Sequence, residues 1–159
     1  MPAFEWAGRM TKQLCDISNV ITRLRVQLRF GTLSRAPLRL LRLEWRPDHV
    51  DCDWVARVND AWDKDLSKCL SDANASLQAL EDAIVVREML FSELPGISSA
   101  TLRVYRPVTD EPGELIIAGT VTKPERTRWN VRSLVMQAKL SGFHFCLDDG
   151  KLTPIQVEQ

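Results

Sequence analysis

The sequence predicts an α+β protein built as one domain. Its 159 residues match the size of a single domain, and 45% hydrophobic with 26% charged residues is typical of a folded globular chain. Segments of alternating apolar and polar residues, which indicate strands, occur together with segments whose apolar residues recur every three or four positions, which indicate helices. The expected order is an N-terminal helix and three-stranded antiparallel meander, a central long or broken helix, and then strand-strand-helix-strand. The alternative to one domain over 1–159 is a subdivision into helix plus meander (1–58) and an α/β half (59–159).

The first helix and the meander are predicted from a change of period. Residues 4–18 place apolar side chains at helical spacing. From Ile21 the period becomes two, which predicts a strand with one apolar and one cationic face. The apolar side chains are Leu24, Val26, Leu28 and Phe30, and those between them are Arg23, Arg25, Gln27 and Arg29. Strands over 38–45 and 49–56, joined by a short turn, complete the meander.

The chain continues with a long helix. Apolar residues recur at helical spacing over 61–94, with Asn59 or Asp60 as the N-cap, a break near 71–74 as an alternative, and Pro95-Gly96 as the end. The elements expected after it are a strand over 100–106, a strand over 114–121, a helix over 125–140 and a final strand over 143–147. The side chains expected in the core are Leu28, Phe30, Leu40, Trp54, Leu80, Ile84, Phe91, Ile117, Leu134 and Phe145.

Charge is balanced in total and uneven along the chain. Residues 1–46 hold nine basic and three acidic residues, whereas residues 47–99 hold four basic and eleven acidic residues. We expect the basic segment to lie against the acidic one, within the chain or across a dimer. A basic arm that binds phosphate or an acidic partner is the alternative.

Cysteine usage and hydropathy predict a cytoplasmic protein. Cys15, Cys52, Cys69 and Cys146 are widely spaced and read as core-facing, so we expect four buried free thiols, with two disulfides as the alternative. The apolar runs are too short to span a bilayer, and the basic N-terminus is not followed by the apolar stretch of a secretory signal.

The arginines of the first two predicted strands are the strongest polar feature. Adjacent strands would place them on one sheet face, where guanidinium groups suit phosphate or carboxylate ligands. The candidate anion-binding residues are Arg23, Arg25, Arg29, Arg39 and Arg42. An ordinary solvent-exposed face, or a face covered by the acidic helix, is the alternative.

Metal and catalytic sites receive little support. His144 with Cys146, and His49 with Cys52, contain the residue types of a zinc site without its usual spacing. The acidic residues Asp48, Asp51, Asp53, Asp60, Asp63 and Asp65 could bind a cation, but such a cluster is more often a solvated face. The common nucleotide, hydrolase and zincin motifs do not occur in the sequence, and we expect no catalytic residue, cofactor or metal.

Two glycines in the second half carry a resemblance to a known family. Gly119 lies in the apolar stretch 114–121, and Gly142 lies in the turn Ser141-Gly142-Phe143 before the last strand. With the helix-strand-strand-helix-strand order of residues 77–147, they resemble the BON domain, a bacterial module. The resemblance implies a non-enzymatic module that associates with phospholipid or with other proteins, and it transfers no catalytic residues.

Two functions follow from these observations. The first is a non-catalytic protein-interaction module that self-associates. The second is a protein, or an enzyme, that binds an anionic small molecule, nucleotide or nucleic acid through the arginine-faced strands. Because tryptophan and arginine anchor many interfaces, we expect a homodimer with Trp6, Trp129 and Arg132 at the contact.

Overall fold

The computed structural model describes residues 17–28, 31–33, 36, 38–59, 65–94, 96–107, 113–123 and 131–156. These residues form an α+β fold, as the sequence predicts. A first helix spans residues 17–27, and the later elements are β1 (Arg39–Trp45), β2 (His49–Val55), α2 (Lys68–Glu93), β3 (Ser99–Tyr105), β4 (Leu115–Thr122), α3 (Leu134–Leu140), β5 (Cys146–Asp148) and β6 (Lys151–Thr153).

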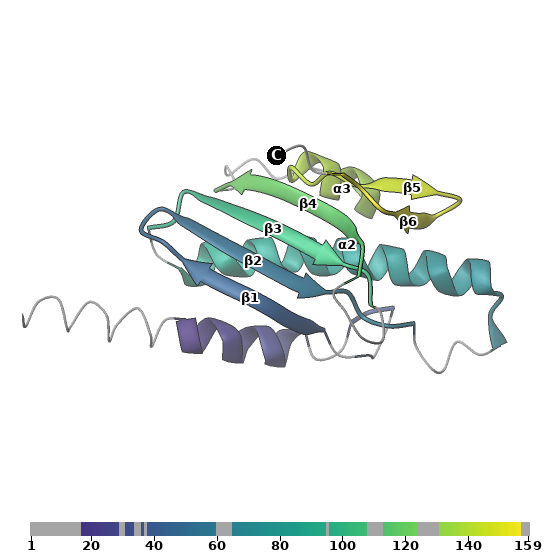
Figure 1. Ribbon diagram of the computed structural model, residues 1–159, viewed down its shortest axis with the longest axis horizontal. Coiled ribbons are helices and arrows are strands. Elements are labelled where there is room, and N and C mark those ends of the chain that lie inside the picture. Colours follow the sequence, from purple (N-terminus) through teal and green to yellow (C-terminus); the bar gives the residue numbers. More distant parts are fainter. Residues whose placement is uncertain are drawn as a thin grey trace, which may run out of the picture.

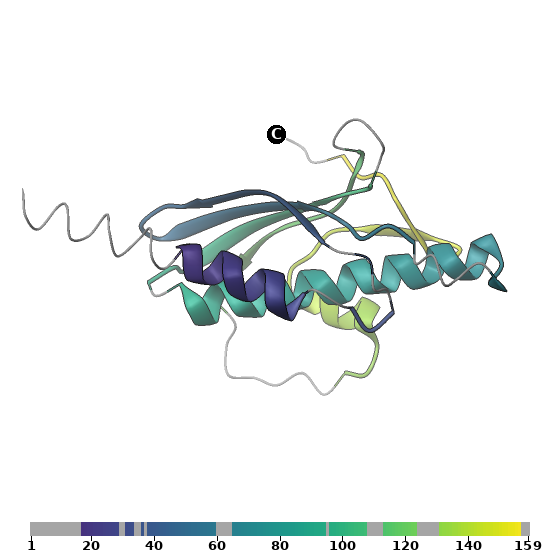
Figure 2. The ribbon, with the colours of Figure 1, turned by 90° about the horizontal axis from the view of Figure 1, so that it is seen from below.

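The main sheet consists of two hairpins joined by a helix. Its strand order is β1-β2-β3-β4, with antiparallel pairs at both ends and the parallel pair β2–β3 in the middle (Figure 1). Parallel neighbours need a crossover connection, which α2 supplies. Figure 2 shows that the helix 17–27, α2 and α3 all lie on one side of the sheet, which we call the helix side. We call the opposite side the open side.

The predicted first strand is wrong, because residues 17–27 form a helix. Val20, Leu24 and Leu28 are buried at intervals of four residues, whereas Val26 is 72% exposed. The spacing of Leu24 and Leu28 fits both a strand and a helix. The packing of Val20 against the same core shows that the segment is a helix. The meander therefore has two strands. The helix predicted over 4–18 falls mostly outside the described residues.

The long helix starts later than predicted and continues past the predicted break. Ser67 is the N-cap, and its side chain accepts a hydrogen bond from the Leu70 N–H. Asn59 does not cap the helix; its side chain donates to Ser71 and Asp72 and ties the chain after β2 to the first turns of α2. The helix is therefore continuous over 71–74.

The C-terminal elements are shorter than predicted. In the described part of the helix expected over 125–140, α3 covers only Leu134–Leu140, with Ser133 as its N-cap. The final strand is a small hairpin, β5–β6, joined at Asp149 and Gly150, which both have positive φ. Two such residues are typical of the tight turns that match the twist of a hairpin.

The core lies between the sheet and the helices. Leu28, Trp54, Leu80, Phe91 and Ile117 are buried as expected. Leu40, Ile84, Leu134 and Phe145 are only half-buried, and Phe30 lies outside the described residues. One cluster includes side chains of the helix 17–27, β2, α2, β3 and β4. No described helix is both long and apolar enough to cross a membrane.

The cysteines are only partly as expected. Cys52, Cys69 and Cys146 are free thiols, but Cys69 and Cys146 are exposed rather than core-facing. Cys69 lies in the first turn of α2 and Cys146 opens β5, which are both solvent-facing positions. Cys52 is buried, and its burial raises the pKa of the thiol to about 12. Cys15 lies outside the described residues.

Candidate functional site

The segment after α3 covers part of the outer edge of β4. Ala118 and His144 exchange two backbone hydrogen bonds of 3.1 and 2.7 Å, and the Ile155 N–H donates to the Leu115 carbonyl at 2.9 Å. In Figure 1, α3 and the β5–β6 hairpin accordingly lie beside β4, at the far side of the sheet from β1. The chain thus returns to the sheet twice after α3 and forms two walls along β4.

Gly119 and Gly142, which carry the resemblance described above, are in contact. A Cβ on Gly119 would lie 2.6 Å from the Gly142 carbonyl oxygen, a distance that side chains do not tolerate. Gly142 itself has φ of +99° and ends α3, with the next N–H, of Phe143, donating to the Ala138 carbonyl. The two glycines therefore allow the turn after α3 to pack directly on the backbone of β4.

A large groove lies along these walls, with a volume of about 1070 Å³. Its lining comes from β3, β4, α3 and the C-terminal segment: Thr101, Arg103, Ala118, Gly119, Thr120, Lys139, Gly142, Phe143, His144, Phe145, Cys146, Pro154, Ile155 and Gln156. Among these described residues every charged side chain is cationic. We call this hollow the β4 groove.

The two cations of the β4 groove differ in how far they are neutralised. Lys139 lies with its Nζ 5.8 Å from the centre of the Phe145 ring and makes no ion pair with any residue in the described ranges. Arg103 is one-third exposed, and its Nη1 lies 3.7 Å from Asp53 Oδ1. Lys139 is therefore the cation most available to a bound carboxylate, with the Phe145 ring next to it for apolar contact.

The open side of the sheet carries a second charged cluster, which is internally paired. Asp51 and Asp53 on β2 are buried, and arginines from both neighbouring strands reach them. The pairs are Arg42 and Arg46 with Asp51, and Arg42 and Arg103 with Asp53, at 3.2 to 3.9 Å. Burial raises the pKa of Asp53, and Arg103 and Arg42 oppose that shift. Guanidinium groups thus occupy the place that a cation would take between these aspartates.

The structure places the candidate anion-binding arginines on two different elements, and of those that it describes only Arg25 and Arg39 line a common hollow. Arg23 and Arg25 lie on the helix 17–27, and Arg23 pairs with Glu93. Arg39 and Arg42 lie on β1, where Arg42 pairs with Glu44. Arg29 lies outside the described residues. A shared cationic sheet face is therefore wrong, because it depended on the strand that is a helix.

Of the two histidine and cysteine pairs, only His144 and Cys146 share a surface. His49 contacts the hydroxyls of Ser99 and Thr101 at 2.7 and 2.9 Å, whereas Cys52, three residues later on β2, belongs to the core. His144 and Cys146 both line the β4 groove. Within the described ranges there is no group of three or more His, Cys, Asp or Glu side chains that could hold a metal ion. Of the acidic residues, 60 and 63 lie outside those ranges.

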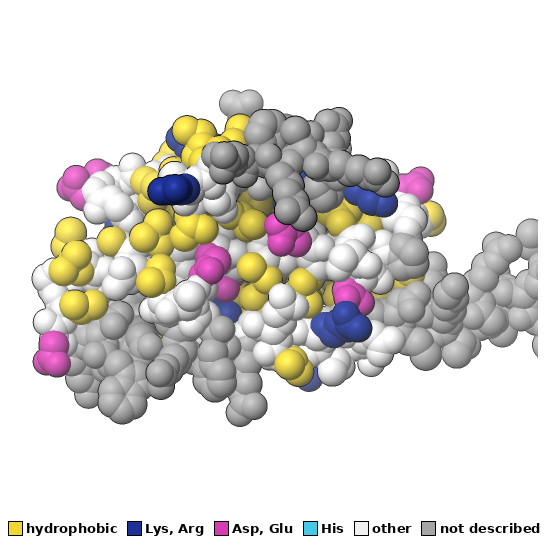
Figure 3. Space-filling view, turned by 180° about the vertical axis from the view of Figure 1, so that it is seen from behind, with side chains coloured by type: hydrophobic (Ala, Val, Ile, Leu, Met, Phe, Trp, Pro, Cys, Tyr) yellow, Lys and Arg dark blue, Asp and Glu magenta, His cyan; other side chains and the backbone are white. Residues whose placement is uncertain are grey.

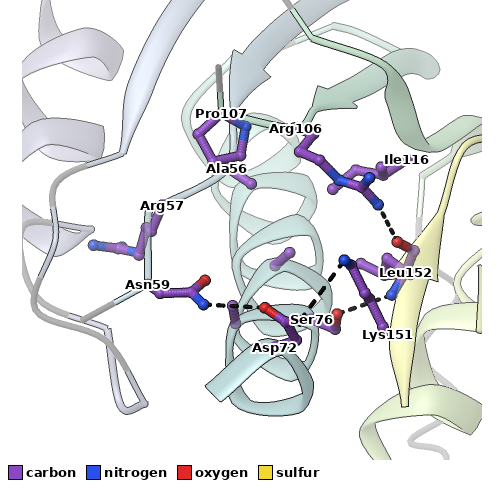
Figure 4. A pocket seen from close by; sticks show the side chains of 12 residues that line it. Ala56, Arg57, Asn59, Asp72, Ser76, Arg106, Pro107, Ile116, Lys151 and Leu152 are labelled. Atoms are coloured by element: carbon purple, nitrogen blue, oxygen red, sulfur yellow. Dashed lines mark hydrogen bonds and ion pairs between the residues drawn. The ribbon is translucent and has the colours of Figure 1, made fainter. Parts of the chain in front are cut away.

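A smaller pocket of about 180 Å³ lies at the carboxyl ends of β2 and β3 (Figure 4). Its polar groups satisfy one another: Lys151 Nζ lies 3.7 Å from Asp72, and the Leu152 N–H donates to Ser76 Oγ at 2.9 Å. Arg106 donates to the Leu152 carbonyl. These contacts tie β6 to α2 and β3, so the pocket is best explained as a structural junction.

The expected interface is described only at one residue. Trp6 and Trp129 lie outside the described residues, and Arg132 is exposed shortly before α3. The β4 groove was missed in the sequence because Arg103, Lys139 and Phe145 come from three separate elements. Gly119 and Gly142 were the available signal for it.

Comparisons with known proteins return no match: no family model, no curated protein and no solved structure is similar to this chain. The resemblance to the BON domain therefore stays a prediction.

Proposed function

We propose that the protein is a non-catalytic interaction module whose β4 groove binds an extended acidic segment of a partner protein. The observation that carries the proposal is the groove's large volume combined with a described lining whose charged side chains are all cationic. Small-molecule pockets span roughly 300–1,000 Å³, so this hollow is large enough for a stretch of polypeptide.

The chemistry of the walls fits such a segment. Lys139 and Arg103 supply charges for carboxylates, and the hydroxyls of Thr101 and Thr120, 3.2 Å apart, supply hydrogen bonds. The Phe145 ring offers an apolar contact beside Lys139. Because these charges are partly exposed, they favour encounter with an acidic partner and lose strength as salt screens them.

The test uses a fluorescein-labelled peptide rich in Asp and Glu with one central Leu. We expect fluorescence polarisation to show saturable binding that weakens as salt rises, and Lys139→Glu to weaken it at least tenfold. The matched control is Lys68→Glu, the same charge change at an exposed position in the first turn of α2. Equal losses in both variants would show net-charge attraction without a site and would contradict the proposal.

A second arm separates proteins from membranes. Anionic phospholipid vesicles carry the headgroup chemistry that the BON resemblance also implies. Vesicle binding that Lys139→Glu abolishes, without peptide binding, would replace the proposed partner by a lipid surface. A lysine-rich peptide that binds as tightly as the acidic one would also reject the proposal.

Self-association is part of the same proposal. On the helix side, hydrophobic side chains lie at the surface among acidic and basic ones (Figure 3). The exposed large apolar residues on the three helices are Val26, Leu70, Met136 and Leu140. We expect light scattering at micromolar concentration to give the mass of a homodimer, and Val26→Lys to shift it towards the monomer. A monomer mass at low and moderate salt would contradict self-association and leave the β4 groove as the binding site.

A further inference from the structure

A second hollow, of about 280 Å³, lies between the helix 17–27, β1 and α2, away from the β4 groove. The lining residues that the structure describes are almost all apolar: Ile21, Leu24, Leu28, Leu38, Leu40, Cys52, Trp54 and Val86, with Arg25 and Arg39 as the charged members among them. We call it the apolar cavity.

The apolar cavity has a buried floor and a charged mouth. Cys52, Trp54 and Val86 are at most 1% exposed, whereas Arg25 and Arg39 are exposed and therefore lie at its solvent end. The Cys52 thiol stays protonated at neutral pH, because burial raises its pKa to about 12. The floor thus carries no charge.

The two arginines at the mouth differ from their neighbours on the same elements. Arg23 pairs with Glu93, and Arg42 pairs with Glu44. Arg25 and Arg39 form no ion pair or side-chain hydrogen bond with any residue that the structure describes. Two cations without a carboxylate partner match the anionic head of an amphipathic ligand, and the apolar walls behind them match its tail.

We propose that the apolar cavity binds a medium-chain alkyl carboxylate, with the tail against the apolar walls and the head at Arg25 and Arg39. The guanidinium group holds a carboxylate through two parallel hydrogen bonds, and burial of the tail removes apolar surface from water. The volume lies just below the usual range for ligand pockets, which fits one alkyl chain and excludes a two-chain lipid.

The first experiment is calorimetric titration with hexanoate, octanoate and decanoate below their micellar concentrations. Each methylene that enters the cavity should tighten binding about fourfold, until the cavity is full. Decanol and decylamine should bind more weakly than decanoate, because neither carries a negative head. Equal binding of decylamine, or no saturable binding of decanoate up to millimolar concentration, would overturn the proposal.

The second experiment uses one arginine pair from each element. Arg25→Gln and Arg39→Gln should each weaken decanoate binding roughly tenfold. Arg23→Gln and Arg42→Gln, on the same helix and strand but outside the cavity lining, should change it less than twofold. All four side chains are exposed, so the variants should keep the wild-type circular dichroism spectrum.

A third measurement locates the ligand. The methyl resonances of Leu24 and Val86 should shift during the decanoate titration, and those of Leu152, behind the smaller pocket of Figure 4, should not. A loss of binding shared equally by all four arginine variants would instead indicate general attraction to a basic surface. Either that result or shifts confined to Leu152 would reject the apolar cavity as the site.

Discussion

The two sides of the sheet hold their charges in different ways. On the helix side, Arg57 and Asp82 form an ion pair whose side chains are only 2% and 3% exposed. On the open side, Asp51 and Asp53 are ringed by arginines that remain 34% to 56% exposed. Removing either partner of the first pair leaves a buried charge, whereas removing an aspartate from the second cluster leaves arginines that are already partly hydrated. The number of ion pairs therefore says little about stability unless the exposure of the surviving partner is known.

The Arg57 guanidinium also joins separate segments of the chain through its hydrogen bonds. It donates to Asp82 at 2.8 and 3.2 Å, to the Ala36 carbonyl at 2.7 Å and to the Leu28 carbonyl. One side chain after β2 therefore ties α2 to the end of the helix 17–27 and to the chain before β1. The open-side arginines link only neighbouring strands that the backbone ladder already joins.

The two sides of the sheet should differ most in how well the fold tolerates a new charge, and β4 allows both positions to be compared on one strand. Ile117 on β4 is fully buried on the helix side, so Ile117→Asp places an unpaired carboxylate in the core at a cost of several kcal/mol. We expect little or no soluble folded protein. Thr120→Asp, at an exposed position of the same strand, should fold normally. Soluble yield and circular dichroism check this, and a well-folded Ile117→Asp protein would contradict the observed core.

Asp82→Asn tests the buried pair directly. The variant leaves Arg57 charged and buried without its counterion, and we expect a loss of about 3–5 kcal/mol in the free energy of unfolding. Urea denaturation measures it. A loss below about 1 kcal/mol would show that the pair behaves like one on the surface, and would remove the contrast between the two sides.

Asp53→Asn should change the free energy of unfolding only slightly, by an amount that depends on pH. Burial raises the pKa of Asp53, so the carboxyl holds its proton more tightly in the folded chain than in the unfolded one. Its stabilising contribution is present below the ordinary aspartate pKa and is lost as the pH rises through the raised, folded value. Wild type should therefore lose stability relative to Asp53→Asn as the pH rises from acid towards neutral. Parallel urea titrations test this, and the opposite trend would contradict the direction of the pKa shift.

Arg42→Gln should have the smallest effect on stability. Arg42 is close to half exposed, and we expect no measurable change in the unfolding midpoint. The change should appear instead at Glu44, because the hydrogen bond from Arg42 lowers the pKa of that carboxyl. A titration followed by NMR should show the pKa of Glu44 moving up towards its ordinary value. A pKa that does not move would show that Arg42 and Glu44 do not interact in solution.

The sequence predicted correctly those elements whose hydrophobic spacing fits only one type of secondary structure. The alternation in β3, and the Cys52 and Trp54 side of β2, are clear in the chain and are confirmed. The helix 17–27 was mistaken for a strand because Leu24 and Leu28 fit both periods, and the contact of Val20 with the core is a tertiary effect. The β5–β6 hairpin had a local signal, the Asp149-Gly150 dipeptide, which is typical of a two-residue hairpin turn, but only a single final strand over 143–147 was predicted.

The candidate sites were less accessible from the sequence. Arg25 and Arg39 were named as anion-binding residues, but on a sheet face that does not exist. They line the same cavity only because the helix 17–27 and β1 both pack near α2. The β4 groove depends on Lys139 and Arg103, which are distant in sequence and share no spacing. The signal for it in the sequence is the pair Gly119 and Gly142, which led to a resemblance to a known family but not to the prediction of a groove.

The central strand pair has a consequence for how the chain is synthesised. Partners in the β2–β3 ladder, from His49 with Ser99 to Val55 with Tyr105, are fifty residues apart in sequence. Each hairpin is local and can form early, but the ladder between them requires closure of a long loop, which is slow. During translation β2 therefore presents an unpaired edge until β3 has left the ribosome. Over that interval the nascent hairpin is open to pairing with a neighbouring chain, and rapid helix formation by residues 68–93 shortens the exposure.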